Sequence, residues 1–369
     1  MNRILSVFSV ILIVMLLAWA AYLRVPFVQE KVASFTEDDF NDSNIYTDLE
    51  SISERLDREI LNGSDSFTIY LKGMDVDSIT KLNDGMDGIF GSGETYRQVG
   101  AVGDTYKKVT ITIKKTTNYF VYNAYVNGNP IPETEKKANI LYMQVKQILD
   151  TQIHDSMTDY EKELALHDYL VTNCCYSEET VQSPDSDIYR AYGALVNHDA
   201  VCNGYAEALQ LLFLCCGMHS EFVIGKADGV DHAWNLVELD GKWYHLDATW
   251  DDPKPDQGKD ALHAYFNVSD EIMEKSHTWE REDYPLANSM DYNYYIRQGL
   301  YFKNFDTYKT SAYAAMVTEG KARYEAVIEN YQENEADMQF VFENNYRYNS
   351  VNWQTFSEGM YNVLVLKAE

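Results

Sequence analysis

One continuous apolar pattern dominates the middle of the chain, over residues 202–216. Apolar residues recur there with the spacing of an α-helix and leave only a narrow polar strip, made by Asn203, Glu207 and Gln210. This pattern predicts a helix that is buried over most of its surface. Gly217 follows the last apolar position, where a glycine commonly ends a helix.

Two strand-like segments follow this helix, at residues 232–239 and 242–250. They flank Asp240 and Gly241, the residue pair that two-residue hairpin turns prefer. The pattern therefore predicts an antiparallel β-hairpin. If these two residues form the loop, the residues on either side of it pair with each other, and that pair fixes the register of both strands.

The predicted register brings chemically useful side chains together. Counting back from the turn sets His232 opposite Thr249, so Asp247 is a diagonal neighbour of His232 on the same face, roughly 7 Å away between backbones. A carboxylate there can orient the imidazole and stabilise its charged form. Cys202 begins the buried helix, where unpaired backbone N–H groups and the helix dipole favour an anion. Together these are the parts that a thiol nucleophile needs.

The same residues carry a resemblance to a known family. The order of Cys202, then HAWN at His232, then HLDATWDDP around Asp247, resembles the transglutaminase-like superfamily, in particular bacterial extracytoplasmic proteins with a transglutaminase core domain. The resemblance covers roughly residues 160–270. It implies a papain-like core in which a helix bearing the cysteine packs on an antiparallel sheet. It also implies that Cys202 is the nucleophile, His232 the base and Asp247 the orienting acid.

The expected reaction follows from this triad. Ala200 stands where animal transglutaminases carry a glycine, and their calcium-binding loops are not evident in this sequence. We therefore predict a thiol enzyme that hydrolyses peptide or carboxamide bonds through an acyl-enzyme on Cys202, as a cysteine peptidase or amidase. Two alternatives stay open, a protein cross-linking transamidase and a non-catalytic peptide- or glycan-binding module on the same fold.

Changes of pattern along the chain, together with the resemblance, predict five parts and an α+β fold class. They are a membrane anchor or signal peptide at 1–23, an acidic stalk at 24–66, a small α+β module at 67–130, the transglutaminase-like core at 131–290 and a C-terminal α+β module at 291–369. Strands are expected at 67–71, 106–115 and 118–126, and helices at 49–61, 133–154 and 158–173. The last of these helices opens with a capping box formed by Thr158 and Glu161.

The N-terminal run Ile4–Leu23 is almost entirely apolar and would span about 30 Å as a helix, enough to cross a bilayer. Its length favours an uncleaved transmembrane helix. A cleaved signal peptide is the alternative, because residues 18–20 have the small-x-small form of a cleavage site. Both interpretations place the rest of the chain outside the cytoplasm, and Arg3 sets the orientation. We expect a single-pass cell-membrane protein, or a secreted one if the N-terminus is cleaved.

The formal net charge of -28 argues against nucleic acid as a partner, because phosphate binding needs a basic surface. The expected partner is a protein or peptide substrate, at the cell surface, and a cationic one would be attracted to the chain. A lone histidine on a helix, such as His167, is more typical of a structural role, and His245 is expected to pack beside the site. No histidine or cysteine spacing is typical of zinc ligands, so we predict no metal and no cofactor.

Four of the five cysteines form the adjacent pairs Cys174–Cys175 and Cys215–Cys216, each near the end of a predicted helix. They can be small buried hydrophobic residues, as cysteines often are. In an oxidising compartment they can instead form a bridge between the two helix ends. The sequence leaves both alternatives open.

Overall fold

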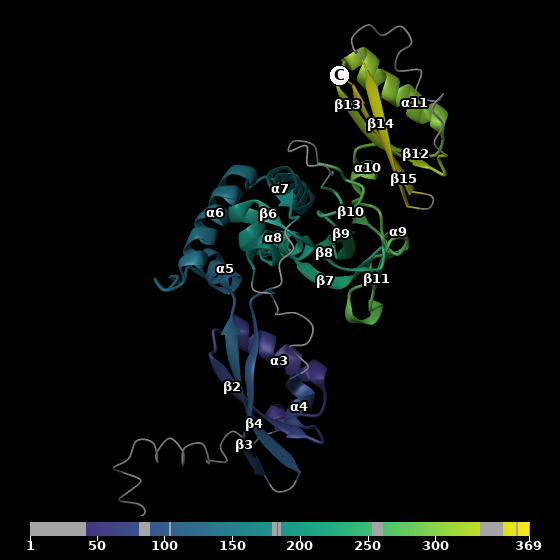
Figure 1. Cartoon of the computed structure of the whole chain (residues 1–369). Helices are drawn as coiled ribbons and strands as arrows, with labels where there is room; N and C mark the ends of the chain where they lie inside the picture. The colour runs from purple at the N-terminus through teal and green to yellow at the C-terminus, as the bar shows by residue number, and fades with distance from the viewer. Residues whose placement is uncertain are drawn as a thin grey trace, which may run out of the picture. The chain divides into compact units, whose positions relative to one another are not determined.

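The computed structural model of the chain describes residues 42–80, 89–102, 105–178, 183, 186–252, 261–332, 350–358 and 361–368. The chain divides into two compact units, Met1–Lys115 and Thr116–Glu369 (Figure 1). The expected membrane span Ile4–Leu23 lies outside the described residues. Within the described ranges, no helix has the length and apolarity that crossing a membrane requires.

Among its described residues, the first unit has a four-stranded sheet, two α-helices and a single 3-10 turn at Asp42–Asn44. The sheet has the order β1 (Ile45–Tyr46), β2 (Ser66–Lys72), β4 (Tyr106–Lys115), β3 (Gly91–Val102), and the helices are α3 (Leu49–Leu61) and α4 (Val76–Ile79). The helix predicted at 49–61 is confirmed, and the Asp48 side chain caps it by accepting a hydrogen bond from the Ser51 N–H at 2.8 Å. Its apolar stripe, Ile52, Leu56 and Ile60, is buried. The polarity of residues 24–66 predicted a stalk. Residues 42–66 instead fold as part of this unit.

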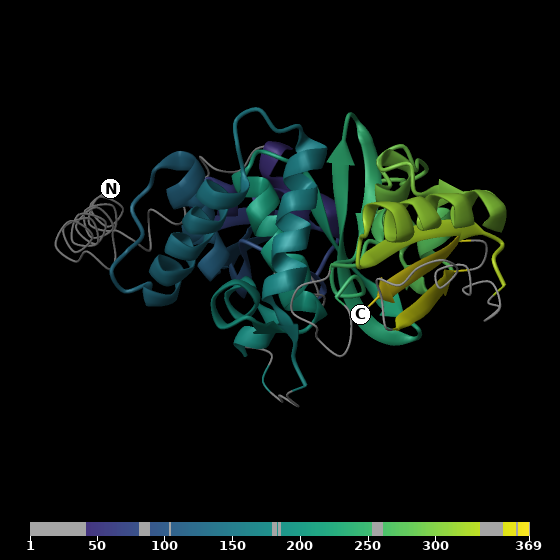
Figure 2. The ribbon, with the colours of Figure 1, turned by 90° about the horizontal axis from the view of Figure 1, so that it is seen from above.

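The second unit contains the central part of the chain, and Figures 1 and 2 show its helices gathered beside a sheet. The helices are α5 (Thr117–Asn127), α6 (Lys136–Gln152), α7 (Asp159–Asn173) and α8 (Cys202–Cys215). The antiparallel sheet has the order β10 (Phe266–Val268), β9 (Lys242–Leu246), β8 (Val230–Leu239), β7 (Ser220–Ala227), β11 (His277–Trp279). Helix α8 packs on β7 and β8 and contacts α5 and α7, so it is enclosed on several sides.

Helix α5 corrects the sequence interpretation. Residues 118–126 are rich in aromatic and β-branched residues and were predicted to form a strand, and this is wrong. The Thr116 side chain accepts a hydrogen bond from the Tyr119 N–H at 3.4 Å, and Gly128 ends the helix with a φ of 69°. A capped start and a left-handed glycine at the end are helix signals that outweigh the strand propensity of the residues between them.

The two helices that frame the site follow the predicted pattern. Helix α7 begins with the capping box that the sequence indicated, with Thr158 and Glu161 each bonded to the other's backbone. Helix α8 begins at Cys202, and 11 of its residues are buried. Gly217 follows Cys216, the residue that caps the C-terminus of α8, and has a φ of 74°, which a glycine adopts without strain. The predicted buried helix at 202–216 is therefore confirmed.

The hairpin of β8 and β9 also has the predicted register. Leu239 pairs with Lys242, and the intervening Asp240 and Gly241 have φ values of 50° and 74°, as a type I′ turn requires. The pairing runs back as far as Asn235 and Leu246. Strand β9 ends there, so the strand predicted at 242–250 is too long, and the predicted pairing of His232 with Thr249 is not formed. Asp247 lies just after the strand, where its N–H donates to the Tyr265 carbonyl.

Short elements complete the second unit. They are the parallel pair β5 (Cys175–Tyr176) and β6 (Asp199–Ala200), single turns at Asp187–Tyr189 and Arg281–Asp283, a π-helix at Gly193–Asn197, α9 (Asp270–Met273) and α10 (Tyr294–Arg297). A third sheet has the order β12 (Tyr301–Phe302), β13 (Arg323–Glu329), β15 (Tyr361–Ala368), β14 (Val351–Glu358). Helix α11 (Phe305–Tyr313) packs on it and runs into a π-helix at Ala314–Glu319. Val363 and Val365 of β15 share a hydrophobic core with Trp234 and Leu236 of β8, so this sheet packs against the central part.

Candidate active site

A buried histidine and a buried aspartate meet at the end of the hairpin. His232 Nε2 lies 2.7 Å from Asp247 Oδ2, and both side chains are almost completely buried. The other oxygen of Asp247 accepts hydrogen bonds from the backbone N–H groups of Thr249 and Trp250, at 3.0 and 3.2 Å. The backbone turn after Asp247 therefore holds the carboxylate in place, and the carboxylate orients the His232 imidazole.

Cys202 faces this histidine from the first turn of α8. The thiol is half-buried, and it lies close enough to the His232 imidazole to help raise the pKa of that ring. Because Asp247 occupies Nε2 of His232, Nδ1 is the ring nitrogen left for the thiol. The residue before Cys202, Val201, caps the helix without a side-chain hydrogen bond, so the Cys202 N–H begins the helix without an intrahelical partner. The structure thus brings the three residues selected from the sequence into one chain of contacts.

The electrostatics of the pair favour a charged histidine. Burial by itself lowers the pKa of His232, but the Asp247 carboxylate and the Cys202 thiol outweigh it and raise the pKa to about 10. Burial raises the pKa of Asp247, but the His232 and His277 imidazoles outweigh it and hold that pKa well below its usual range. An imidazolium between a carboxylate and a thiolate, formed when the thiol gives its proton to the ring, is the protonation state that a cysteine nucleophile uses.

His277 is a residue of the site that the sequence interpretation missed. Its Nε2 lies 3.1 Å from the same Asp247 oxygen that contacts His232, and its Nδ1 lies 2.9 Å from the Ser276 hydroxyl. It comes from β11, which pairs with β7 rather than with the hairpin. Thirty residues separate it from Asp247, and no local pattern marks it. Asp247 therefore orients two imidazoles, not one.

The start of α8 is held by close backbone contacts. A Cβ at Gly204 would lie 2.7 Å from the Ile188 carbonyl oxygen and 2.8 Å from the Ala200 Cβ, so only a glycine fits without movement. The Val201 N–H donates to the same Ile188 carbonyl at 2.9 Å. One turn into the helix, the Tyr205 hydroxyl donates to Asp252 Oδ2 at 2.5 Å. These contacts fix the position of Cys202 relative to the turn that carries Asp247.

His245 has a separate set of partners, as its expected packing role suggested. Its Nε2 lies 2.8 Å from Asp270, and its Nδ1 accepts a hydrogen bond from the Trp234 indole at 2.9 Å. Burial lowers the pKa of His245. The ring is buried in the sheet and orients Trp234, whose indole in turn stacks on His232 with 6.0 Å between ring centroids.

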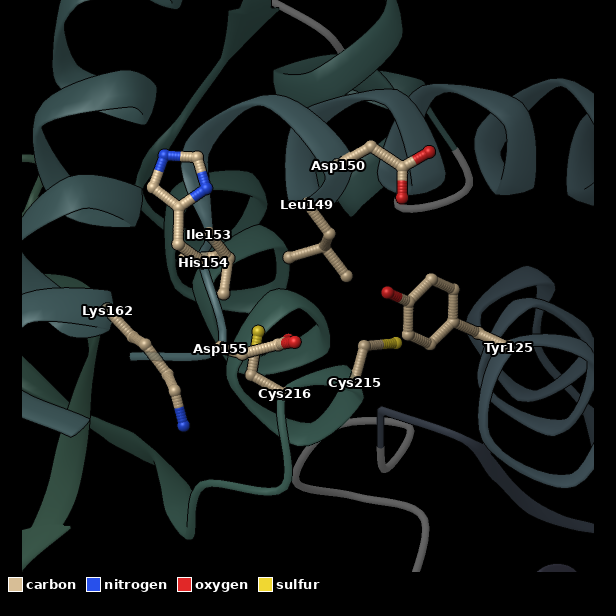
Figure 3. Close-up of a pocket in the computed structure, with 9 residues that line it drawn as sticks. All are labelled: Tyr125, Leu149, Asp150, Ile153, His154, Asp155, Lys162, Cys215 and Cys216. Atoms are coloured by element: carbon tan, nitrogen blue, oxygen red, sulfur yellow. The ribbon is translucent and has the colours of Figure 1, made fainter. Parts of the chain in front are cut away.

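The cysteine pairs lie at opposite ends of α7. Cys215 and Cys216 line a pocket of about 570 Å³ with Lys162, in the first turn of α7, as Figure 3 shows. Cys174 directly follows the last residue of the same helix. Twelve helical residues span about 18 Å, whereas disulfide-bonded cysteines need Cα atoms within about 7 Å. All five cysteines are free in the structure, and this distance excludes the bridge between the two pairs that the sequence left open.

Comparison with known proteins places the site in a family. Residues 146–248, which include all three candidate residues, match the sequence model of the Transglutaminase-like superfamily. The chain is 24% identical to the Kyphoscoliosis peptidases of Mus musculus, over 118 residues, and of Homo sapiens, over 116 residues. These segments cover 29% and 28% of this chain and 18% of each relative, so the chain spans less than a fifth of their length.

Among solved structures, the crystal structure of a TGase matches 57% of this chain and 59% of its own, with a TM-score of 0.27 and 18% sequence identity. That likeness is weak and carries no part of the assignment. The family match over residues 146–248 does carry it, since the matched segment spans α7, α8 and the hairpin. Over that segment, the chain matches the transglutaminase-like superfamily.

Proposed function

We propose that this protein is a thiol enzyme that hydrolyses peptide or carboxamide bonds, with Cys202 as nucleophile, His232 as general base and acid, and Asp247 as the orienting group. The observation that carries the proposal is the position of His232. Its imidazole lies between a buried carboxylate at 2.7 Å and the thiol that begins α8. This is the order of groups that activates a cysteine for attack on a carbonyl.

The reaction proceeds in two steps. The Cys202 proton passes to His232, the sulfur attacks the carbonyl carbon, and a C–S bond forms as the carbonyl becomes an oxyanion near the Cys202 N–H. His232 then gives its proton to the nitrogen of the leaving amine, the C–N bond breaks, and a thioester remains on Cys202. In the second step His232 takes a proton from water, which attacks the thioester and releases the acid and the free thiol.

The acceptor decides between hydrolysis and cross-linking. Water gives a peptidase or amidase, whereas a lysine amine gives a transamidase. The formal net charge of -28 supports a cationic peptide or protein as the substrate, because such a molecule is attracted to the chain. Ala200, at the position where animal transglutaminases carry a glycine, supports hydrolysis over cross-linking.

The test is incubation of the chain with a peptide library that contains glutamine, with and without a labelled primary amine, followed by mass spectrometry. We expect cleaved or deamidated products that depend on Cys202. Amine incorporation that outruns both would establish the cross-linking alternative. Identical product profiles for the wild type and Cys202→Ala would leave a peptide- or glycan-binding module as the function of the fold.

We further propose that the chain is anchored in the cell membrane through Ile4–Leu23 and acts outside the cytoplasm. The length and apolarity of that run support this location. Protease treatment of intact cells tests it, because an exposed chain is digested while a cytosolic marker survives. Full-length protein that persists until the cells are lysed would refute this location.

A further inference from the structure

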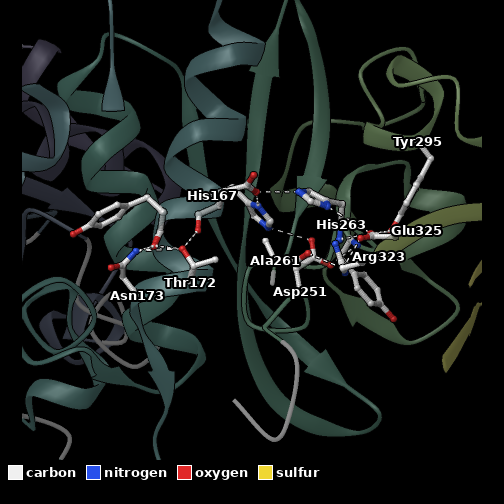
Figure 4. A network of polar contacts seen from close by, with 12 residues as sticks. His167, Thr172, Asn173, Asp251, Ala261, His263, Tyr295, Arg323 and Glu325 are labelled. Atoms are coloured by element: carbon white, nitrogen blue, oxygen red, sulfur yellow. Dashed lines mark hydrogen bonds and ion pairs between the residues drawn. The ribbon is translucent and has the colours of Figure 1, made fainter. Parts of the chain in front are cut away.

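A second cluster of histidines and carboxylates lies away from Cys202, between α7 and the segment that leads into β10 (Figure 4). One oxygen of Asp168, Oδ1, lies 2.9 Å from His167 Nδ1 and 3.0 Å from His263 Nε2. Both imidazoles are almost completely buried, whereas the Asp168 side chain is 43% exposed. Three potential ligand atoms therefore converge at a place that solvent reaches from one side.

Each ring also has a buried carboxylate on its far side. His167 Nε2 lies 3.2 Å from Asp251 Oδ2, and His263 Nδ1 lies 3.5 Å from Glu325 Oε1. Neither far nitrogen forms an aligned hydrogen bond with a described residue. A carboxylate behind each ring is the arrangement that orients histidines bound to a metal ion, because it holds the proton on the nitrogen that faces away from the metal.

The unliganded cluster cannot satisfy all these contacts with neutral rings. A neutral imidazole carries one proton, so each ring can donate either to Asp168 or to its far carboxylate, but not to both. Two protonated rings, with 5.5 Å between their centroids, would satisfy every contact without a metal. A single dication at the convergence point satisfies the same contacts with neutral rings, since each ring then donates only to its far carboxylate.

The charge of the cluster is compatible with a dication. The cluster holds three carboxylates, those of Asp168, Asp251 and Glu325, and one guanidinium, that of Arg323, which lies 2.6 Å from Glu325. With both rings neutral, these groups carry two negative charges, which one dication compensates. Imidazole and carboxylate ligands suit zinc and similar transition metals, and the exposed side of Asp168 leaves room for water as a further ligand.

We propose that His167 Nδ1, Asp168 Oδ1 and His263 Nε2 bind one divalent transition-metal ion of the zinc class. The spacing of histidines and cysteines predicted no metal, and it could not indicate this site, because His263 lies 95 residues beyond Asp168. The ion links α7 to the segment before β10 and, through Glu325, to β13 of the C-terminal sheet. It thereby stabilises the packing of that sheet against the central part of the unit.

The test is metal binding by the full-length chain in mild detergent, after treatment with a chelator. Titration with zinc chloride in a calorimeter should show one equivalent bound, and zinc should raise the melting temperature. Asp168→Asn and His263→Gln should abolish both effects, with far-UV circular dichroism to establish that the variants fold. Glu325→Gln should weaken binding by roughly 10- to 100-fold.

His277→Gln is the matched control, because His277 belongs to the other cluster of histidines and a carboxylate, around Asp247. This variant should bind zinc as the wild type does. Cobalt(II) in place of zinc should show visible absorption without the sulfur charge-transfer band that a cysteine ligand produces. The proposal is overturned by absent zinc uptake, by uptake that survives Asp168→Asn and His263→Gln, or by a sulfur band. All these measurements are independent of catalysis.

Discussion

Replacing the carboxylate that orients His232 should disable the thiol without dismantling the fold. Asp247→Asn keeps the size of the side chain, and its amide oxygen can still accept the Thr249 and Trp250 N–H groups at Oδ1. Its NH₂ group would then face His232 Nε2 and must donate to it. The ring is forced to carry its proton on Nδ1, toward Cys202, and cannot accept the thiol proton.

The loss can be estimated from the burial of the pair. Both side chains are at most 7% exposed, so in Asp247→Asn a positive charge on His232 would be buried without its partner and the neutral ring is favoured. Removing one member of a buried ion pair costs about 3–5 kcal/mol. The equilibrium constant for proton transfer from the Cys202 thiol to His232 should therefore fall by a factor of about 10² to several times 10³. Alkylation of Cys202 at mildly acidic pH should slow by about 10²-fold or more, because the thiolate is the species that reacts.

The assay is the rate of iodoacetamide labelling of each cysteine, followed by mass spectrometry of the digested protein. In the wild type, Cys202 should react before the other four cysteines. Asp270→Asn is the matched control, because Asp270 contacts a different buried imidazole, that of His245, at 2.8 Å. Equal labelling rates for Cys202 in the wild type and in folded Asp247→Asn would refute the reasoning. An equal loss in both variants would refute the specific role of Asp247.

Three further results are expected. Gly204→Ala should lower the free energy of unfolding by about 1–3 kcal/mol, because its Cβ would press on the Ile188 carbonyl, and an unchanged urea midpoint would contradict this. His277→Gln should slow Cys202 alkylation by about tenfold, since it removes one charge-assisted hydrogen bond from Asp247, and an effect as large as that of Asp247→Asn would be inconsistent with a supporting role. The pKa of His232 is raised from 6.5 to about 10, so its contribution to stability is complete below pH 6.5 and is lost as the pH rises through 10. Urea unfolding should show this alkaline loss in the wild type and a smaller one in His232→Gln.

The local parts of the site could be predicted because each depends on neighbours in sequence. The buried helix follows from the spacing of apolar residues after Cys202, and the contact between His232 and Asp247 follows from the register that the two-residue turn sets, although Asp247 lies just beyond its strand. His277 and His263 could not be found in this way. Each meets its aspartate only after the chain has crossed the sheet or returned to α7, over 30 and 95 residues.

The strand prediction for residues 118–126, which lie in helix α5, was wrong for a different reason. Its residues have high strand propensity, and the outcome was decided at its ends, by Thr116 and Gly128. Propensity is a weak signal when aromatic residues can pack equally well on a helix, and the caps are the features that distinguish the two. A start signal at Thr116 together with the glycine after Asn127 would have favoured the helix.

The acidic run that begins at Asp247 shows how distant elements define the site together. Asp247 holds His232 of the hairpin, Asp251 lies 3.2 Å from His167 on α7, and Asp252 accepts the Tyr205 hydroxyl from α8. The turn is also bonded to itself, since the Asp251 N–H donates to the Asp247 carbonyl at 3.1 Å. Each acid thus ties the same short segment to a different element. The distance between the thiol on α8 and the carboxylate behind His232 is therefore set by Asp252 and Asp251 as well as by the hairpin, and a cation at His167 would act on Cys202 only by stiffening this segment.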